Sequence, residues 1–428
     1  MLARPAEPPS GVSGRLPVAC REVWSTDRFP NPPGVPLLAL VRSPRFSAVA
    51  LLTAAVLGLV LANTPVGPGL DHVLHVHAPW GAVGLDLSVS HWISDGLLAV
   101  FFLLVAIELK HELVAGELSN PKTAIVPAIA AIGGVLVPAG VFLAVTAGTQ
   151  YTHGWPIPTA TDIAFALGVL AMFGRGLPST IRVFLLALAV LDDLIAIVII
   201  AVVFAHDTDF LALGGAVVLL VLFWVLGRML RPGRSGQGWL IAGMVVIGLL
   251  TWWLVYHSGV HATIAGVALG LVLPRRPGHT LHERVEPWSN AIVLPVFAFA
   301  SAAVMIPAVG IGELSPTFWA VVIALPVGKV IGITLFGAVA TRLFRGPGRP
   351  SLSFSSIVTV SVLGGIGFTV SLLMNELAFA SNDEIVDEGV LAVLVGSGIA
   401  MVASAVVVSL KARHHRARRE LSEAEATE

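Results

Sequence analysis

The chain is built from long apolar runs that short polar loops separate. A run of about 18 or more apolar residues can cross the hydrocarbon core of a bilayer as a helix, and about twelve such runs occur here. They lie near residues 46–62, 93–114, 124–147, 157–173, 181–204, 211–229, 239–255, 258–273, 288–307, 317–341, 354–378 and 388–410. These runs predict an all-α polytopic membrane protein with about 12 transmembrane helices.

The composition of the chain excludes several classes of protein. Charged residues make up 12% of the 428 residues and the mean hydropathy is +0.89, whereas a soluble domain carries about 25% charged residues. A soluble enzyme is therefore excluded. The 25 Lys and Arg residues are balanced by 26 Asp and Glu residues, so no basic field exists that would bind nucleic acid. A single cysteine, Cys20, excludes a disulfide framework and a Cys-rich metal site.

The basic residues predict the orientation of the chain. Cytoplasmic loops of membrane proteins collect Lys and Arg. In a twelve-span arrangement, every Lys and Arg except Lys329 lies at a terminus or in every second loop, and therefore on one side of the membrane. Both termini are therefore expected in the cytoplasm. We divide the chain into a disordered N-terminal extension (1–44), rich in Pro, Gly and Arg, a transmembrane domain (45–410) and a cytoplasmic C-terminal tail (411–428).

Four ionisable residues lie deep inside the apolar runs, where each is costly unless it has a partner or a function. They are the acids Asp162, Asp192 and Asp193 and the base Lys329. A buried ion-pair network that only joins helices is one explanation. Three acids against one base leave surplus negative charge, however, and a cation site needs such a surplus. The remaining acids of interest, nearer the ends of their runs, are Asp95, Glu108, Glu112 and Glu376.

Two of the runs contain segments that weaken a helix. In the run 157–173, Pro158 removes a backbone N–H and clashes with the preceding turn, while Thr159 and Thr161 can satisfy the freed backbone groups. The run 354–378 contains clustered glycines, which lower helix stability: Gly364, Gly365 and Gly367. Both runs are therefore predicted to be discontinuous helices.

The two weakened runs occupy equivalent places in two triplets of runs. By the loop charges, the third to fifth runs and the tenth to twelfth runs have opposite orientations, which predicts inverted-topology repeats. Two broken helices that cross near the membrane midplane bring partial charges of both signs into the hydrocarbon. Asp162 can offset the positive helix ends and Lys329 the negative ones. This arrangement is typical of a transporter with an ion site at the midplane.

At this point the chain resembles the NhaA-type sodium/proton antiporters, a family whose inverted repeats are a known example of this architecture. The resemblance covers roughly residues 45–410 in the same order. It rests on the segments Thr159–Gly168, Leu186–Asp193, Gly259–Thr263, Leu294–Ala300, Gly328–Lys329 and Gly365–Thr369.

The resemblance implies a role for each matching residue. Asp192 and Asp193, with Thr161 nearby, would form the ion site, and Asp162 would compensate the helix ends at the crossing. Lys329 would pair with Asp192 and compete with the ion. The stretch Asp71–Ser90 matches a small periplasmic β-hairpin through which the family forms homodimers.

The cytoplasmic funnel of the family is where this chain departs from the pattern. Glu108 and Glu112 match acids that the family uses for its pH response. The family has Arg where this chain has His111, and a Glu-His…His cluster where this chain has His282, Glu283, Arg284 and Glu286. We therefore predict a pH response that involves Glu108, Glu112, Glu283 and Glu286, with an altered set-point or a weak effect.

The function that the resemblance implies is electrogenic exchange of sodium, or lithium, for protons. The protein would lie in a bacterial cytoplasmic (inner) membrane, expel sodium at the expense of the proton gradient, and maintain sodium and pH homeostasis. A buried carboxylate can hold a proton or help to hold a cation but hardly both, so competition with alternating access gives exchange. Sodium is a hard ion that prefers oxygen ligands. No cofactor and no enzymatic activity are expected.

Other function classes fit the sequence less well. A sodium-coupled symporter needs a further polar or basic pocket, and a channel needs a continuous polar path. For a membrane enzyme, His257 and His261 have the i, i+4 spacing of zinc ligands, but Gly259 lies between them and no acidic third ligand is near. These two are expected to be solvated loop histidines or to pack between helices. The adjacent acids also lack the patterns of an intramembrane aspartyl protease or a prenyl-transferase.

Overall fold

The computed structural model describes residue 41 and residues 43–77, 85–205, 208–230, 236–306, 311–344 and 353–425. The predicted N-terminal extension (1–44) lies almost wholly outside these residues. Within the described part, nine helices are long and apolar enough to cross a membrane. They are α2 (Pro44–Ala62), α4–η3–α5 (Val89–Ala115), α6 (Pro121–Val145), η5–η6–α7 (Thr152–Phe173), α8 (Ser179–Val203), α9 (Phe210–Met229), α10 (Gly238–His257), α14–η9–α15 (Pro316–Leu343) and the part Asp383–Arg418 of α18 (Asp383–Glu425).

A tenth span is bent. Helices α16 (Phe354–Gly364) and α17 (Phe368–Phe379) pass the same test together and meet at an angle of 49°. The predicted polytopic all-α architecture is confirmed at this level. The elements between the spans include η4 (Glu117–Ser119), α12 (Arg275–Trp288) and η8 (Ile311–Glu313).

Two predicted spans contain shorter helices than the sequence suggested. In the run 258–273, α11 (Thr263–Val272) has only 10 residues, because Gly259 at φ +76° interrupts the helical backbone before it. In the run 288–307, the π-helical turn η7 (Ser289–Val293) leads into α13 (Leu294–Ser301). The total of twelve spans therefore stays a prediction.

The predicted β-hairpin Asp71–Ser90 is wrong at its beginning. Residues up to His75 belong to α3 (Gly67–His75), which starts with Pro68 in its first turn and has an i, i+4 contact of 3.1 Å between Asp71 and His75. In the described part of this stretch, one isolated antiparallel bridge joins His77 to Ser88. Residues 78–84 lie outside the described part.

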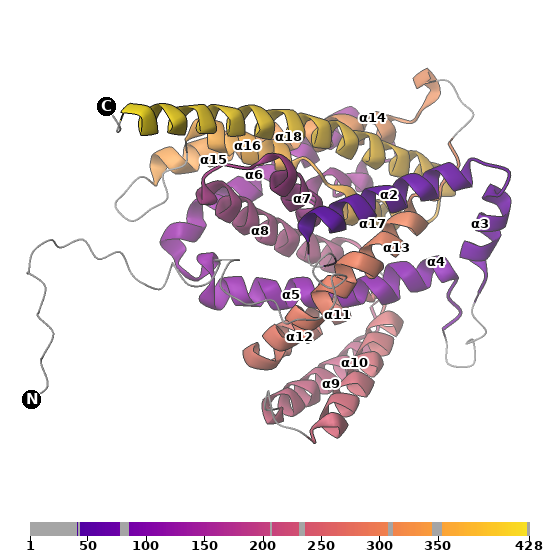
Figure 1. The fold of residues 1–428 in the computed structure, drawn as a ribbon. Coiled ribbons are helices and arrows are strands. Elements are labelled where there is room, and N and C mark those ends of the chain that lie inside the picture. The colour runs from indigo at the N-terminus through magenta and orange to yellow at the C-terminus, as the bar shows by residue number, and fades with distance from the viewer. Residues whose placement is uncertain are drawn as a thin grey trace, which may run out of the picture. The chain divides into compact units, whose positions relative to one another are not determined.

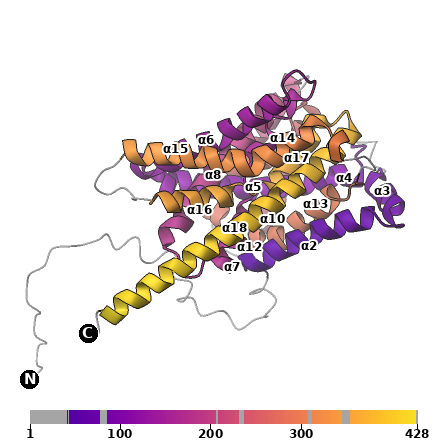
Figure 2. The ribbon, with the colours of Figure 1, turned by 90° about the horizontal axis from the view of Figure 1, so that it is seen from above.

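Glycines allow the two helices that carry the central residues to approach closely. Helices α6 and α15 (Lys329–Leu343) run side by side (Figure 2), and a β-carbon on Gly332 would strike the backbone carbonyl of Gly133. Small residues at such a contact are the usual device for packing helices in membranes. Helices α5 (Leu98–Ala115) and α11 pack together in the same way, and α9 and α10 form a further pair (Figure 1).

The two weakened runs are interrupted in the structure. Before α7 (Ile163–Phe173) the chain forms only 3₁₀ turns, η5 (Thr152–Gly154) and η6 (Ile157–Thr159), followed by non-helical residues 160–162. Pro156 and Pro158 lack the N–H groups that an α-helix needs there. Residues 365–367 separate α16 from α17. Pro158 and Thr159 thus lie in η6, Gly364 ends α16, and Gly365 and Gly367 lie between α16 and α17.

Candidate functional site

The two interrupted segments bind each other directly. The backbone N–H of Asp162 donates to the carbonyl of Ile366 at 2.6 Å. The hydroxyl of Thr161 donates to the carbonyl of Gly364 at 2.8 Å. Segments about 200 residues apart in the chain therefore satisfy each other's freed backbone groups, as membrane-buried backbone must.

Asp162 joins the first turns of two helices. Its Oδ1 accepts from the N–H of Phe165 at 3.0 Å and thereby caps α7. Its Oδ2 accepts from the N–H of Thr369 at 3.2 Å and from the Thr369 hydroxyl at 2.7 Å, at the start of α17. The carboxylate is buried and lies where two helix N-termini concentrate partial positive charge.

Lys329 lies in an entirely buried ion pair. Its Nζ is 2.6 Å from Oδ2 of Asp192, and the side chains are 0% and 2% exposed. The same Nζ donates to Oγ1 of Thr161 at 3.0 Å. Lys329 is the first residue of α15, directly after the π-helical turn η9 (Ala324–Gly328). Oδ1 of Asp192 has no hydrogen-bond partner among the described residues.

Asp193 lies on a different surface from its neighbour. Successive residues on a helix point about 100° apart, so the two carboxylates face separate environments. Asp193 lines a cavity of about 150 Å³ together with Thr161, Asp162 and Thr369, whereas Asp192 does not line it. No hydrogen bond from the described residues reaches the Asp193 carboxylate. An unpartnered carboxylate at a cavity can accept a proton or coordinate a cation.

The more exposed part of this cavity, which we call its mouth, is lined by a histidine between two glutamates. Nε2 of His282 is 3.9 Å from Oε2 of Glu108, and Nδ1 of His282 is 3.7 Å from Oε2 of Glu286. All three residues line the cavity. Burial lowers the pKa of His282 below its ordinary value, so near neutral pH the imidazole is neutral.

The structure does not place all four predicted pH-response acids at this mouth. Glu112 accepts a hydrogen bond from the N–H of Glu117 at 3.0 Å, and Glu283 lies 3.6 Å from His279 with 65% of its side chain exposed. Neither lines the cavity. Only the i, i+4 spacing of His282 and Glu286 on the polar helix α12 could have indicated from the sequence that this histidine joins the cluster.

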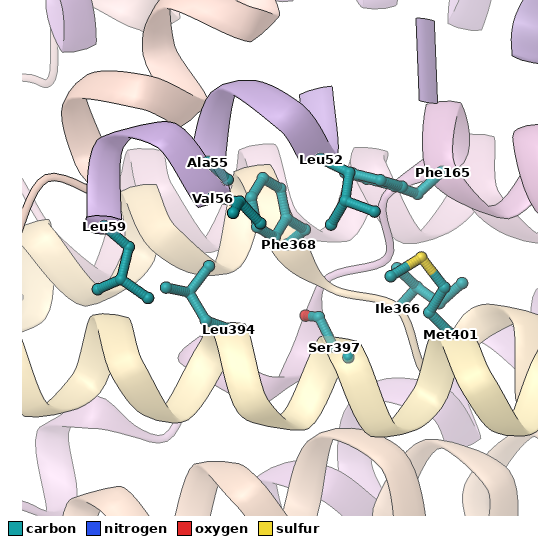
Figure 3. A pocket seen from close by; sticks show the side chains of 11 residues that line it. Leu52, Ala55, Val56, Leu59, Phe165, Ile366, Phe368, Leu394, Ser397 and Met401 are labelled. Atoms are coloured by element: carbon teal, nitrogen blue, oxygen red, sulfur yellow. The ribbon is translucent and has the colours of Figure 1, made fainter. Parts of the chain in front are cut away.

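A second crevice, of about 120 Å³, lies beside the crossing but has no ionisable group. Apolar side chains of α2 and α18 point toward one another across it (Figure 3). Ser397 is its polar lining residue, and Ile366 and Phe368 bring it close to the second interruption. A crevice of this composition cannot hold a cation.

The two histidines that were considered as zinc ligands have other partners. Nδ1 of His257 contacts the carbonyl of Trp253 at 2.9 Å. Nε2 of His261 is 3.1 Å from Oδ1 of Asp95, with only 12% of each side chain exposed. The expectation of a solvated loop histidine is therefore wrong for His261. In the part of the chain that the structure describes, no three His, Cys, Asp or Glu residues form a group that could hold a metal.

Comparison with known proteins gives a consistent picture. The family model described as "Na+/H+ antiporter 1" matches residues 39–408. The chain is 57% identical over 382 residues to "Na(+)/H(+) antiporter NhaA 2" of Clavibacter michiganensis, which covers 89% of this chain and 93% of that protein. It is 44% identical over 373 residues to "Na(+)/H(+) antiporter NhaA" of Tropheryma whipplei, covering 87% and 95%. It is also 45% identical over 390 residues to "Na(+)/H(+) antiporter NhaA 3" of Streptomyces coelicolor, covering 88% and 80%.

Proposed function

The chain belongs to the Na+/H+ antiporter 1 family of membrane transporters, which confirms the resemblance noted in its sequence, and we propose that it exchanges sodium for protons. In detail, the protein would expel sodium or lithium from a bacterial cell across the inner membrane while protons enter. The exchange would move net charge, draw on the proton gradient and serve sodium and pH homeostasis.

One observation carries this proposal: the two adjacent acids of α8 have unequal surroundings. Asp192 is bound to Lys329, whereas Asp193 faces the cavity without a hydrogen-bond partner among the described residues. Two acids against one base leave one negative charge for a monovalent cation. A static ion-pair network does not explain an unpartnered carboxylate at a cavity.

The residues around Lys329 suggest how proton and sodium compete. Sodium prefers oxygen ligands, and we expect these to be the oxygens of Asp193, Oδ1 of Asp192 and Oγ1 of Thr161. Lys329 occupies the other oxygen of Asp192 and also Thr161. An entering sodium ion would displace one proton from Asp193 and a second proton from the Lys329–Asp192 pair, and reprotonation of both groups would expel the ion. Two protons for one sodium make the cycle electrogenic.

The paired interruptions would provide alternating access. Asp162 and Thr161 connect the first interruption to the second, so both would move as one body past the surrounding helices. We assign Asp162 and Lys329 to the compensation of the helix ends at a crossing near the midplane. The segments α6 to α8 and α14 to α18 would be the inverted repeats, and both termini would lie in the cytoplasm.

The cavity would open to the cytoplasm, because α12 at its mouth carries Arg275, Arg276 and Arg284. The pH response would act through Glu108 and Glu286, which line that mouth. Glu112 and Glu283 lie outside the cavity and would contribute only indirectly. Two copies would associate through residues 71–90.

The test is exchange in everted membrane vesicles from a strain that lacks its own antiporters. Respiration acidifies the vesicles, a fluorescent probe reports the pH gradient, and sodium, lithium or potassium is added between about pH 6.5 and 9. Wild type should give rapid dequenching with sodium and lithium. Asp193→Asn should give none, whereas Asp383→Asn, at an exposed acid of α18, should behave as wild type.

Either of two results would contradict the proposal. Wild-type protein that is folded and inserted but gives no response at any pH would remove antiport and favour a symported substrate. Full exchange by Asp193→Asn would remove the ion site from α8.

A further inference from the structure

Four polar residues that the proposed mechanism does not use gather at the end of α17 away from the cavity. The hydroxyl of Ser94 donates to Oε1 of Glu376 at 3.3 Å. Next to Ser94, Asp95 is paired with His261, and both Asp95 and His261 act electrostatically on Glu376. These groups come from three separate elements: η3 (Trp92–Leu97), the loop before α11, and α17.

Glu376 lies in line with the ion site along α17. Thr369, which lines the cavity and binds Asp162, is seven residues before Glu376. Seven residues are almost two helical turns, so the two side chains lie on one face about 10 Å apart along the axis. The positions between them on that face are Leu372 and Leu373, each 1% exposed. One apolar turn therefore separates the cavity from Glu376.

The span Val89–Ala115, which contacts Glu376 through Ser94, shows the same order of polar and apolar residues. Ser94 lies at one end of the span Val89–Ala115 and Glu108, at the cavity mouth, lies 14 residues further on. Between them, Leu98 is buried in the same apolar core as Leu372 and Leu373. Buried apolar residues thus lie between the polar residues of both segments.

Of the two carboxylates among these four residues, that of Glu376 is the one without a basic partner. The Asp95 carboxylate has His261 at 3.1 Å, and the other ring nitrogen of His261 is 2.7 Å from the hydroxyl of Thr263. Glu376, in contrast, has a single hydroxyl contact and no basic partner within ion-pair distance among the described residues. Its side chain is only partly buried.

We propose that Glu376 is a relay carboxylate on the outer half of the transport route, which receives the monovalent cation after Asp193 releases it. This inference rests on the proposed function and on the orientation that places this end of α17 outside. In the state described here the Leu372–Leu373 turn keeps the two carboxylates apart. Movement of the interrupted helices past α5 would shift the Leu372–Leu373 turn and let the cation pass to Glu376. The Glu376 carboxylate would then bind the cation until water replaces the protein oxygens around it.

The test measures sodium kinetics separately at the two faces of the membrane. Right-side-out vesicles present the outer face and everted vesicles the inner face, and both report the KM for sodium and the maximal rate. The variants are Glu376→Gln, which removes the charge, and Glu376→Asp, which keeps it. Glu384→Gln is the matched control, because Glu384 is an exposed acid in the first turn of α18.

Glu376→Gln should raise the outer KM about fivefold, the factor expected from losing one nearby charge in a hydrated site. A variant cannot change the equilibrium constant of sodium exchange. If the outer KM rises while the inner KM stays unchanged, the maximal rate of sodium exit must therefore fall. Loss of a residue that only supports the fold would change the sodium kinetics at both faces alike. Glu376→Asp should recover most of the outer affinity, and Glu384→Gln should match wild type.

The inference fails alone if wild type exchanges sodium for protons and Glu376→Gln leaves the outer KM unchanged. It also fails if Glu376→Gln changes KM equally at both faces, or if Glu384→Gln causes the same shift. Absence of exchange by the wild type would instead remove the proposed function and this inference with it. If Glu376→Gln does not insert, Glu376→Asp decides: an outer KM raised by less than fivefold with an unchanged inner KM supports the relay, and a change of equal size at both faces overturns it.

Discussion

Replacing Thr161 by valine should weaken the connection between the two interrupted segments while leaving the volume of the side chain almost unchanged. The Thr161 hydroxyl accepts from Nζ of Lys329 at 3.0 Å and donates to the carbonyl of Gly364 at 2.8 Å. Valine removes both hydrogen bonds and leaves a buried carbonyl without its partner. Thr161→Val therefore tests whether this hydroxyl connects α7, α15 and α16.

The magnitude follows from the two lost bonds. Hydrogen bonds between membrane helices contribute about 0.6 kcal/mol on average and at most about 1.7 kcal/mol, and a bond to an ammonium group is near the upper end. Lys329 keeps Asp192 as a partner. We therefore expect the free energy of unfolding to fall by about 2–3 kcal/mol, together with a lower maximal rate of sodium exchange.

The assay is thermal unfolding of the purified protein in detergent, followed by tryptophan fluorescence, beside vesicle exchange. Thr161→Ser should restore most of the stability, since serine keeps the hydroxyl. Thr341→Val is the matched control, because that hydroxyl bonds only to the Gly337 carbonyl one turn earlier in its own helix. The reasoning is refuted if Thr161→Val melts with wild type, or if Thr341→Val loses as much stability.

Three further predictions concern helix packing, the helix cap and the cavity mouth. Gly332→Ala should lower the free energy of unfolding by about 1–3 kcal/mol, because the new β-carbon meets the backbone of α6. Gly140→Ala is the control and should have no such effect, since its β-carbon meets nothing within 4 Å. Equal unfolding midpoints for the two variants would contradict the close contact at Gly332. Asp162→Ala should cost about 1–2 kcal/mol through loss of the α7 cap, and Asp162→Asn, which keeps an acceptor oxygen, should recover part of it in the same melting assay. Burial lowers the pKa of His282, so the imidazole binds a proton more weakly in the folded state than in the unfolded state. The free energy of unfolding is therefore unaffected by this group above the ordinary pKa of 6.5 and falls as the pH drops below it. Wild type should therefore lose stability relative to His282→Gln between about pH 7 and 5, and a difference that does not depend on pH would contradict a buried imidazole.

Much of the architecture was predictable because hydropathy and charge act locally along the chain. An apolar run long enough for a bilayer must become a helix, so ten of the predicted runs correspond to described spans, one of them bent. The interruptions near Pro158 and Gly365 were also predictable, since proline removes a backbone donor and glycine weakens a helix. The length of α11 was not, because it depends on the left-handed backbone of Gly259.

The sequence by itself determined that this chain is a multi-pass helical membrane protein with surplus acidic residues inside its spans. Long apolar runs, and the ionisable residues within them, can be recognised directly along the chain, and each such residue is costly unless it has a partner or a function. Only the tertiary structure decided the surroundings of each acid. That Asp192 binds Lys329 while Asp193 faces the cavity depends on how α8 is rotated against α15. That Glu376 meets Ser94 depends on contacts between residues 282 positions apart. Such contacts are set by the packing of all the helices together, and no local pattern records them.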